Sequence, residues 1–496
     1  MENGLNKKYG LLTAICMVVG IVVGSGVFFK AQTILQKTEG NMVMGIWAWL
    51  IGGAIMLCCI AAFSIMATKY EKVNGVVDYA EATVGRKYGY VIGWFMTMIY
   101  YPTLTSVLAW LSARYTLVFL TSAFPNRITL VIPAAEGGCV VGPECMALAL
   151  FFLCAAYAIN ALSPKIAGHF QVATTIIKLI PLLLMAVVGI IVGLVSDQGV
   201  LLENMANPGA ETTGNPLFGA IVATAFAYEG WIIATSINAE LKDAKRNLPI
   251  ALIAGGIIIV AIYLFYYIGV AGGATVEDLM HDGATTAYLN IFGGAFGNIL
   301  NLFVAISCMG TLNGLMLGCT RGIYAVATRG EGPHPEMFRQ VDKVTNMPNN
   351  ASILGLLLCG FWFLFFYGSN LAAFGWFGLF SFDSSELPIV TIYALYIPIY
   401  LMFMKKATDL SFTRRYLIPA LGLIGSVFMV FAAIYAHGIQ PYLAAKASGG
   451  FACPIVFYLI FFAVVLVWGL AHYKNRQADA RTPQTSAEPA PEAGQK

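Results

Sequence analysis

Apolar runs long enough to cross a membrane follow one another along almost the whole chain. Runs of about 18 or more apolar residues are typical of membrane-spanning helices. The twelve candidates have the approximate bounds 10–35, 42–69, 87–121, 145–163, 168–195, 216–240, 248–272, 294–329, 351–367, 373–404, 414–437 and 452–474. Helices are expected because lipid offers open backbone groups no hydrogen-bond partner, and the runs lack the polar alternation of an outer-membrane barrel. The sequence therefore predicts an all-α polytopic membrane protein with twelve transmembrane helices.

The composition argues against a soluble protein and against an enzyme. Only 11% of the residues are charged, whereas about a quarter of the residues in a typical soluble domain are charged. The stretches between the apolar runs are too short for a catalytic domain. The chain also lacks the zinc-protease motif H-E-x-x-H, a phosphate-binding P-loop and any Cys/His spacing typical of a metal site. We therefore expect a lipid bilayer around the chain, and no enzyme activity, cofactor, metal or nucleic acid.

Lysine and arginine are distributed unevenly between the two sets of connecting segments. If the chain begins in the cytoplasm, the cytoplasmic set carries Lys7, Lys8, Lys69, Lys72, Arg86, Lys87, Lys165, Lys242, Lys245, Arg246, Arg339, Lys343, Lys405, Lys406, Arg414 and Arg415. The opposite set carries only Lys30, Lys37, Arg127 and Lys446. This asymmetry satisfies the positive-inside rule. It predicts a multi-pass protein of the cell (inner) membrane with both termini in the cytoplasm.

Two of the apolar runs are interrupted near their centres. The first contains Gly24-Ser25-Gly26, and the sixth is interrupted at Tyr228-Glu229-Gly230. Interrupted helices at matching positions of two inverted halves indicate the binding site of a transporter. Each break exposes N–H groups at one helix end and carbonyls at the other, which suits a zwitterion. Close packing of small residues is the alternative, but the carboxylate in the second break favours a ligand site.

The two breaks divide the chain into segments. The expected division is a cytoplasmic N-terminus at 1–9, helices 1–5 as the first repeat at 10–195, helices 6–10 as the inverted repeat at 216–404, helices 11 and 12 at 414–474, and a disordered cytoplasmic tail at 475–496. The tail is rich in Pro, Ala, Gln and acids, a composition typical of disorder. Cys139 and Cys145 share the loop after the third run, where a disulfide and two separate thiols are both compatible with the sequence.

Five segments match the span signatures of one group of membrane transporters. "VVGIVVGSGVFF", "YYPTLTSVLAWLSARY" and "TIIKLIPLLLM" match the first, third and fifth spans, and the more specific "FAYEGWIIATSINAELKDAKRNLPIAL" and "SCMGTLNGLMLGCTRGIYAVATRGEGPHP" match the sixth and eighth. Over roughly residues 10–405 the chain thus resembles a permease of the APC (amino acid–polyamine–organocation) superfamily, of the bacterial L-type amino acid transporter branch. The resemblance implies a LeuT-type fold, with a 5+5 inverted repeat, broken helices 1 and 6, and alternating access.

The resemblance also assigns substrate contacts to the breaks. The N–H groups implied for the substrate carboxylate belong to Gly24, Ser25 and Gly26, and the Ser25 hydroxyl is a further donor. The carbonyls implied for the α-amino group belong to Val22, Phe226 and Ala227, with Phe226 also acting as a gate over the substrate. On the eighth span, Met309 and Asn313 are implied to line the pocket for the substrate side chain, where Met forms an adaptable wall.

Lys178 lies about twelve residues into the fifth span, where an ammonium is costly and must find a partner. One interpretation is that its long side chain extends to the cytoplasmic interface. The other follows from the resemblance, because a lysine at this position in related sodium-independent carriers reaches the unwound part of span 1. Its ammonium there takes the place of a sodium ion. The resemblance therefore implies that Lys178 substitutes for a sodium site.

Glu229 stands in the break of span 6, where the family has Gly or Asp. A charged carboxylate at mid-membrane costs about 2.5–3.5 kcal/mol on insertion scales. One hypothesis is that Glu229 biases the site toward positively charged or small amino substrates, or couples binding to a proton. The other is that it only caps N–H groups that the break exposes.

Other polar residues have less definite roles. Asp383 and Glu386 lie either at the external interface or in an outer vestibule, where Arg114 is a candidate partner. The histidines are expected at the solvated surface, and they are His169, His281, His334, His437 and His472. The first cytoplasmic loop, "VNGVVDYAEATVG", departs from the family's inner-gate pattern and keeps only Gly75, Tyr79 and Gly85.

The sequence thus predicts a sodium-independent secondary transporter, an exchanger of small to medium neutral L-amino acids. The alternative is a proton-coupled carrier of cationic amino acids, amines or polyamines that uses Glu229. A membrane sensor or membrane enzyme forms a third class, which the missing output domain argues against. The family's eukaryotic light chains use an external Cys to join a single-span partner, but the short termini and compact loops here favour a carrier without an obligatory accessory subunit. The preferred amino acid, the direction of transport and the oligomeric state stay open.

Overall fold

The computed structural model describes residues 10–70, 75–124, 142–162, 164–196, 199–210, 214–234, 241–342, 347–371 and 375–473. The predicted N-terminal segment 1–9, the tail 475–496 and Cys139 lie outside these residues, so the predictions about them stay predictions. The described chain is almost entirely helical.

The first half of the chain begins with a bent pair of helices. α1 (Leu11–Val22) and α2 (Gly26–Lys37) meet at an angle of 50°. They are followed by α3 (Met42–Tyr70), α4 (Val76–Thr83), α5 (Arg86–Phe95), the π-helical turn η1 (Met96–Tyr100), α6 (Tyr101–Ala123), α7 (Pro143–Leu162), α8 (Pro164–Leu184), the π-helical turn η2 (Met185–Gly189), α9 (Ile190–Val195) and α10 (Leu201–Ala206).

The second half begins with another interrupted helix. α11 (Pro216–Ala227) is separated by three residues from α12 (Trp231–Ala234). The elements that follow are α13 (Ala244–Ala271), α14 (Val276–Asp282), α15 (Ala284–Thr328), α16 (Pro335–Phe338), α17 (Asn349–Phe366), η4 (Tyr367–Leu371), η5 (Gly378–Phe380), α18 (Leu387–Lys406), η6 (Thr413–Leu417), α19 (Ile418–Ile434), η7 (Tyr435–Ile439), α20 (Gln440–Ala447) and α21 (Pro454–Ala471).

Local sequence signals explain several helix starts. Proline is the first residue of α11, where its fixed φ suits the helix and its missing N–H costs nothing. The Asn215 side chain caps the same helix by accepting a hydrogen bond from the Leu217 N–H. At α14 the Thr275 side chain accepts from the Asp278 N–H in the same way. These caps fix where each helix enters the bundle.

The described residues contain ten helices that are long and apolar enough to cross a membrane, or eleven if the bent pair α1–α2 counts as one span. The all-α membrane architecture is therefore confirmed. The predicted sixth span, 216–240, appears as α11 with the short α12, and its remaining residues 235–240 lie outside the described chain. The count of twelve and the inverted repeat stay predictions.

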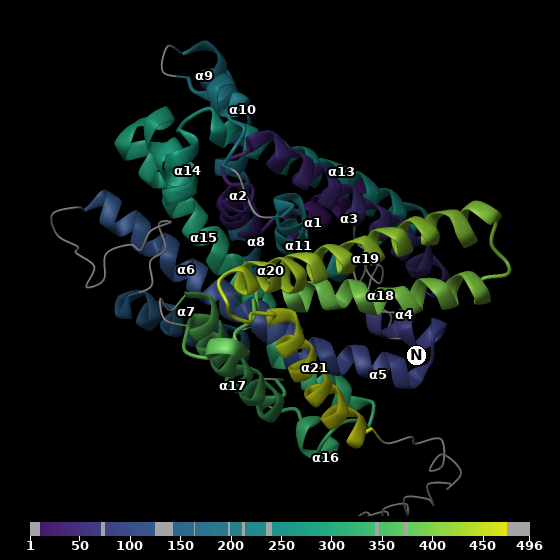
Figure 1. Cartoon of the computed structure of the whole chain (residues 1–496). Helices are drawn as coiled ribbons and strands as arrows, with labels where there is room; N and C mark the ends of the chain where they lie inside the picture. Colours follow the sequence, from purple (N-terminus) through teal and green to yellow (C-terminus); the bar gives the residue numbers. More distant parts are fainter. Residues whose placement is uncertain are drawn as a thin grey trace, which may run out of the picture.

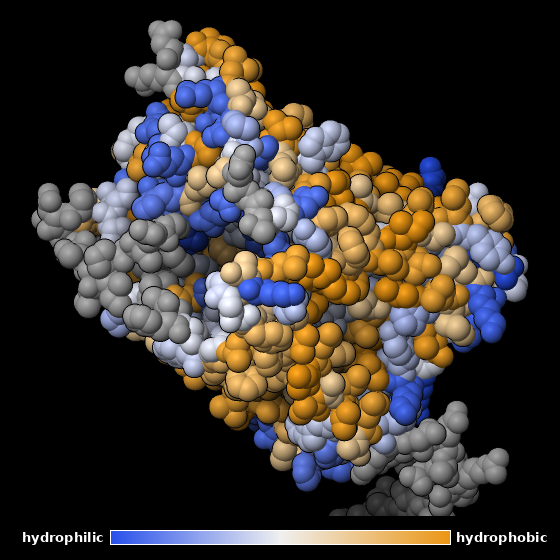
Figure 2. Space-filling model, in the orientation of Figure 1, coloured by the Kyte–Doolittle hydropathy of each residue, from blue (hydrophilic) through white to orange (hydrophobic). Residues whose placement is uncertain are grey.

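An apolar belt covers the sides of the bundle. Its exposed side chains include Ile257 and Phe265 on α13, Ile424 on α19, and Leu459 and Val467 on α21. Figure 2 shows this apolar surface between two more polar ends. Such a belt suits contact with lipid tails, because exposed apolar patches of this extent are rare on soluble monomers.

The two ends of the bundle carry different elements. α9, α10 and α14 lie at one end, which we call the α14 end, and α4 and α16 lie toward the other (Figure 1). Between them, α6 packs against α15, and α13 packs against α1 and α3.

The backbones of η2 and α13 touch at two glycines. A Cβ atom added to Gly269 would lie 2.0 Å from the carbonyl oxygen of Met185. A Cβ atom added to Gly189 would lie 2.4 Å from the carbonyl oxygen of Gly269.

Candidate ligand-binding site between two helix breaks

The first break lies between α1 and α2 and coincides with Gly24-Ser25-Gly26. α1 ends at Val22 and α2 begins at Gly26, so carbonyls at the end of α1 and N–H groups at the start of α2 lack partners within their own helices. A Cβ on Gly26 would lie 2.7 Å from the Cα of Ala227 in α11. Glycine is therefore required at this position, and the two breaks are in backbone contact.

The second break lies between α11 and α12. Tyr228, Glu229 and Gly230 form a turn after α11 ends at Ala227. Gly230 has a φ of +104°, which lies in the left-handed region that glycine adopts readily. The helix is thus interrupted at Tyr228-Glu229-Gly230, as predicted, and Gly230 supplies the left-handed backbone conformation of the turn.

A cavity of about 240 Å³ lies between the two breaks. Its walls come from both breaks and from η1, α6, α8 and α15. The lining residues are Ile21, Val22, Gly24, Ser25, Gly26, Tyr100, Leu104, Leu108, Gln171, Lys178, Phe226, Ala227, Glu229, Gly230, Thr311, Gly314 and Leu315. The structure therefore brings together all the site residues predicted on helices 1, 5 and 6.

Lys178 lies inside the bundle, at the end of α1. Its side chain is buried, and its Nζ donates a hydrogen bond of 2.6 Å to the Gly20 carbonyl oxygen. Gly20 belongs to the last turn of α1, whose carbonyls carry the negative end of the helix dipole. The ammonium therefore meets the negative end of the first break, and the side chain does not extend to the membrane interface.

Glu229 faces the cavity from the second break. The Tyr100 hydroxyl donates a hydrogen bond to its Oε1. Oε2 is buried and has no hydrogen-bond partner among the described residues. Tyr100 is the last residue of the π-helical turn η1, a feature often found at functional sites. The capping hypothesis and the substrate-tuning hypothesis for Glu229 are both compatible with these contacts.

Three of the buried polar atoms without partners belong to residues that line this cavity. Besides Glu229, the Ser25 hydroxyl and the Gln171 Oε1 have no hydrogen-bond partner within the part of the chain that the structure describes. Buried polar groups are normally hydrogen-bonded. Three such atoms, from both breaks and from α8, thus line one cavity, and a polar ligand there would complete their hydrogen bonding. Gln171 was missed in the sequence because a single Gln in an apolar run resembles no motif.

The contribution of α15 differs from the prediction. Its cavity-lining residues are Thr311, Gly314 and Leu315, which share one face of the helix at spacings of three and four. Met309 and Asn313 do not line this cavity. Asn313 lies on another face, where its Nδ2 donates to the Ala167 carbonyl and its Oδ1 accepts from Asn160 Nδ2 at 2.9 Å. Asn313 thus joins α15 to α7 and α8.

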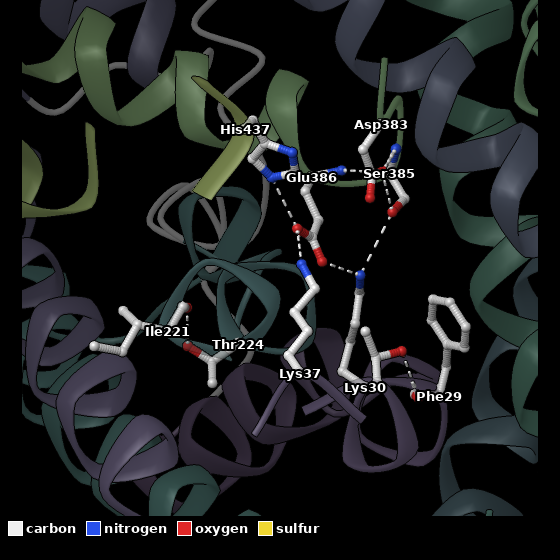
Figure 3. A network of polar contacts seen from close by, with 10 residues as sticks. Phe29, Lys30, Lys37, Ile221, Thr224, Asp383, Ser385, Glu386 and His437 are labelled. Carbon is white, nitrogen blue, oxygen red and sulfur yellow. Dashed lines mark hydrogen bonds and ion pairs between the residues drawn. The ribbon is translucent and has the colours of Figure 1, made fainter. Parts of the chain in front are cut away.

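A buried ion-pair cluster lies beyond Phe226, toward the α14 end. Glu386 Oε1 is 2.7 Å from Lys30 Nζ, and Glu386 Oε2 is 2.8 Å from Lys37 Nζ and 3.1 Å from His437 Nε2. Figure 3 shows the three basic side chains converging on this one carboxylate, which we call the Glu386 cluster. The Lys30 Nζ is also 5.3 Å from the centroid of the Phe226 ring. The cluster therefore connects α2 with the start of α18 and with η7, and Phe226 separates it from the cavity.

The cluster corrects three expectations. Glu386 is not at the interface, because its side chain is fully buried. His437 is not a surface histidine, because it is 8% exposed and contacts Glu386. Arg114 does not pair with an acid of this loop, since its guanidinium donates to Gln32 Oε1 at 2.8 Å. Sequence position alone did not reveal these contacts because they join residues far apart in the chain.

Ion pairs also join α4 and α5 to the residues at the end of α15. Arg329 is 2.8 Å from Asp78 and 3.0 Å from Glu81, and Arg86 is 2.8 Å from Glu331. Burial raises the pKa of the Glu331 carboxyl, although the Arg86 guanidinium acts in the opposite direction. The first loop, which departs from the family pattern in sequence, is thus held to α15 by charge pairs.

Comparison with known proteins extends these observations over most of the chain. Residues 9–448 match the model of a family described as amino acid permease. The chain is 29% identical to the serine/threonine exchanger SteT of Bacillus subtilis (strain 168) over 440 residues, which are 86% of this chain and 91% of that protein. It is 24% identical to the human b(0,+)-type amino acid transporter 1 over 446 residues, 89% of this chain and 85% of that one. It is 25% identical to the mouse Asc-type amino acid transporter 1 over 363 residues, which are 72% of this chain and 63% of that protein.

These relatives are transporters and not enzymes, in agreement with the absence of a catalytic motif from the sequence. The chain belongs to the amino acid permease family, within the APC superfamily.

Proposed function

We propose that this protein is a sodium-independent secondary transporter that exchanges small to medium neutral L-amino acids by alternating access. The observation that carries the proposal is the cavity between the two helix breaks. N–H groups at the start of α2 suit a carboxylate, and carbonyls at the ends of α1 and α11 suit an ammonium. An α-amino acid carries these two charges on groups that are bonded to the same carbon atom. The relatives named as exchangers and amino acid transporters support the same class of substrate.

The site residues have proposed roles that follow from this arrangement. Gly24, Ser25 and Gly26 bind the substrate carboxylate through their N–H groups, and the Ser25 hydroxyl, which has no partner among the described residues, donates to it as well. The carbonyls proposed for the α-amino group are those of Val22, Phe226 and Ala227. The substrate side chain then lies toward α6 and α15, against Leu104, Leu108 and Leu315.

The size and lining of the cavity support a small substrate. Its volume of about 240 Å³ is below the roughly 300–1,000 Å³ of sites that take drug-sized ligands. Leucines and glycines form much of its wall, so the side chain that it takes is small or medium and largely uncharged. The name of the serine/threonine exchanger from Bacillus subtilis points in the same direction.

The orientation follows from the charge distribution. We place both termini in the cytoplasm and the protein in the cell membrane, with the α14 end outside, because Lys and Arg concentrate on the opposite connections. The Glu386 cluster then closes the external side of the site in this conformation. No accessory subunit is needed for this arrangement.

Two experiments test whether Lys178 takes the place of a sodium ion: replacing sodium in the buffers, and replacing Lys178 in the protein. Because the Lys178 ammonium occupies the negative end of α1, exchange should proceed unchanged when choline replaces sodium on both sides of a liposome. The Lys178→Met variant should lose exchange by about tenfold or more, since the Gly20 carbonyl then lacks its charged partner. Counterflow of radiolabelled L-serine measures both effects. The control is Lys87→Met, which removes an exposed lysine of α5, and a requirement for sodium in the wild type would refute the assignment.

A second candidate function is a proton-coupled carrier of cationic amino acids, amines or polyamines. The unpartnered Oε2 of Glu229 favours it, because a buried carboxylate oxygen facing a cavity suits a cationic group or a proton. On this alternative, L-lysine rather than L-alanine is the better substrate, and an inward proton gradient accelerates its uptake.

The Glu229→Gln variant distinguishes the two candidates. Glutamine keeps the size and one acceptor oxygen but removes the charge. Under the leading proposal we expect L-alanine exchange to stay within about threefold of the wild type at both pH 6 and pH 8, and L-lysine to remain a poor competitor. Under the alternative, L-lysine competition should weaken by about tenfold or more and the pH dependence should disappear. Glu203→Gln, which neutralises an exposed acid of α10, is the matched control.

A competition panel tests the proposed function as a whole. Purified protein is placed in liposomes loaded with a mixture of amino acids, and external radiolabelled L-serine is offered with an excess of one unlabelled amino acid or amine at a time. Exchange that small neutral L-amino acids inhibit supports the proposal. Uptake that occurs equally into empty liposomes would show uniport instead of exchange, and no uptake of any amino acid would refute amino acid transport.

A further inference from the structure

A tyrosine of α13 contacts the first helix break from behind the cavity wall. Tyr263 is fully buried, and its hydroxyl donates a hydrogen bond of 3.2 Å to the Val22 carbonyl oxygen. This carbonyl is the last of α1 and has no partner within its helix. A carbonyl oxygen has two lone pairs, so the bond from Tyr263 leaves one of them available. Val22 is also one of the residues that line the cavity.

The ring of the same tyrosine contacts the second break. It stacks on the ring of Tyr228, with 5.3 Å between the centroids and 26° between the planes. Tyr228 is the first residue after α11, and its hydroxyl donates to the Trp49 carbonyl oxygen at 3.0 Å. The Trp49 ring meets both tyrosines edge-on, at 5.6 Å from each. One side chain of α13 therefore touches both breaks.

We infer that Tyr263 is a positioning residue that holds the two helix breaks in register for the α-amino group of the substrate. This inference rests on the proposed function. The hydroxyl fixes the direction of the Val22 carbonyl, and the ring fixes Tyr228 and with it the carbonyls at the end of α11. An ammonium shared between carbonyls of two separate segments requires both to lie at hydrogen-bond distance at once. Tyr263 links them, and it is not among the residues that line the cavity.

The chain contains a matched control one turn further along α13. Tyr267 is also buried, and its ring lies 6.2 Å from the same Trp49 ring. Its hydroxyl has no hydrogen-bond partner among the residues that the structure describes. Replacing either tyrosine with phenylalanine removes one buried oxygen from the same aromatic cluster. Only the change at Tyr263 removes a hydrogen bond to a helix break.

The first measurement does not depend on the substrate. Hydrogen–deuterium exchange of the purified protein is followed in peptides that contain residues 20–26 and 227–231. For Tyr263→Phe we expect exchange in both peptides to rise by about two- to tenfold, the range that corresponds to the loss of one hydrogen bond. For Tyr267→Phe we expect exchange to match the wild type. Equal exchange in the two variants would overturn the inference.

The second measurement separates positioning from general damage. Counterflow of radiolabelled L-serine into liposomes loaded with unlabelled L-serine gives an apparent KM and a maximal rate. Because the carbonyl contributes to binding before and during translocation, Tyr263→Phe should raise KM by about two- to tenfold with little change in the maximal rate. Tyr267→Phe should change neither value. A fall in the maximal rate with an unchanged KM in Tyr263→Phe would mean that the hydroxyl is structural only.

The two measurements also separate this inference from the proposed function. If the wild type takes up no amino acid, the proposed function fails, and hydrogen–deuterium exchange still decides whether Tyr263 holds the breaks. If the wild type exchanges L-serine and both variants behave like it, the proposed function stands and the positioning role of Tyr263 is refuted.

Discussion

Replacing Glu386 with glutamine is expected to open the α14 end of the bundle. The substitution leaves the buried Lys30 and the partly exposed Lys37 facing a neutral side chain. Removing one partner of a buried ion pair costs about 3–5 kcal/mol, and every 1.4 kcal/mol is a factor of ten. The cluster is intact in the closed conformation described above, and in an open conformation the two lysines would reach water. The ratio of closed to open protein should therefore fall by more than about a hundredfold. Initial exchange rates should fall because each cycle must pass through the closed form.

The rate at which a cysteine in the cavity reacts with an external reagent measures this effect. A Leu108→Cys substitution places a thiol on the cavity wall, and a membrane-impermeant thiol reagent is added outside. Modification of the peptide that contains residue 108 is followed by mass spectrometry, so that the native cysteines do not interfere. We expect modification to be far faster when Glu386→Gln is present. The control Glu277→Gln removes an exposed acid of α14 at the same end; the same rate in both backgrounds would contradict the role of the cluster.

A single methyl group at Gly26 is expected to weaken substrate binding strongly. In Gly26→Ala the new Cβ would lie 2.7 Å from the Cα of Ala227 and 3.1 Å from the carbonyl oxygen of Phe226. Both atoms belong to backbone, so no flexible side chain gives way and the two breaks must separate. Overpacking of this kind costs about 1–3 kcal/mol, and a misplacement of about 1 Å in a binding geometry costs on the order of a hundredfold. We expect the apparent affinity for L-serine to fall by about a hundredfold or more.

Equilibrium binding of radiolabelled L-serine to purified protein checks the prediction, with the monodisperse fraction on size exclusion as the test of folding. Gly360→Ala is the control, because a Cβ there meets nothing within 4 Å and alanine is the better helix former. A Gly26→Ala protein that is folded and binds L-serine as tightly as the wild type would show that the breaks do not touch during binding.

The broad architecture was predictable because hydrophobic runs and broken helices leave direct marks in a sequence. The bounds of the predicted span 42–69 agree with α3 (Met42–Tyr70) within a residue. The interruption at Gly24-Ser25-Gly26 is visible because glycine is the residue that a close backbone approach needs. The same holds for Lys178, since an ammonium deep in an apolar run must find a partner.

The contacts that complete the site were less predictable. Tyr100, Gln171 and Tyr263 stand in runs where a tyrosine or glutamine carries no recognisable spacing, and their roles arise from the way distant helices meet. Met309 and Asn313 were assigned by position in a motif. A helix turns by about 100° per residue, so an assignment one or two positions away selects a different face. The cavity meets the face of Thr311 and Leu315.

Partner choice among charged residues was the least predictable feature. Arg114, Asp383, Glu386 and His437 all occur near the external ends of predicted spans. Their pairing depends on distances between helices that are more than fifty residues apart in the chain. Asp383 instead accepts hydrogen bonds from the N–H groups of Ser385 and Glu386, and the carboxylate that pairs with the lysines is that of Glu386.

The glycine contact between η2 and α13 joins the two helices whose side chains hold the end of α1. Lys178 lies on α8, which continues into η2, and Tyr263 lies on α13. The side chains that hold the last carbonyls of α1 thus stand on two helices whose backbones touch at Gly189 and Gly269. A tilt of α1 that keeps both hydrogen bonds must carry α8 and α13 with it. The Glu386 cluster instead ties α2 to α18 and η7, so the two halves of the bent pair α1–α2 are held by side chains of different helices.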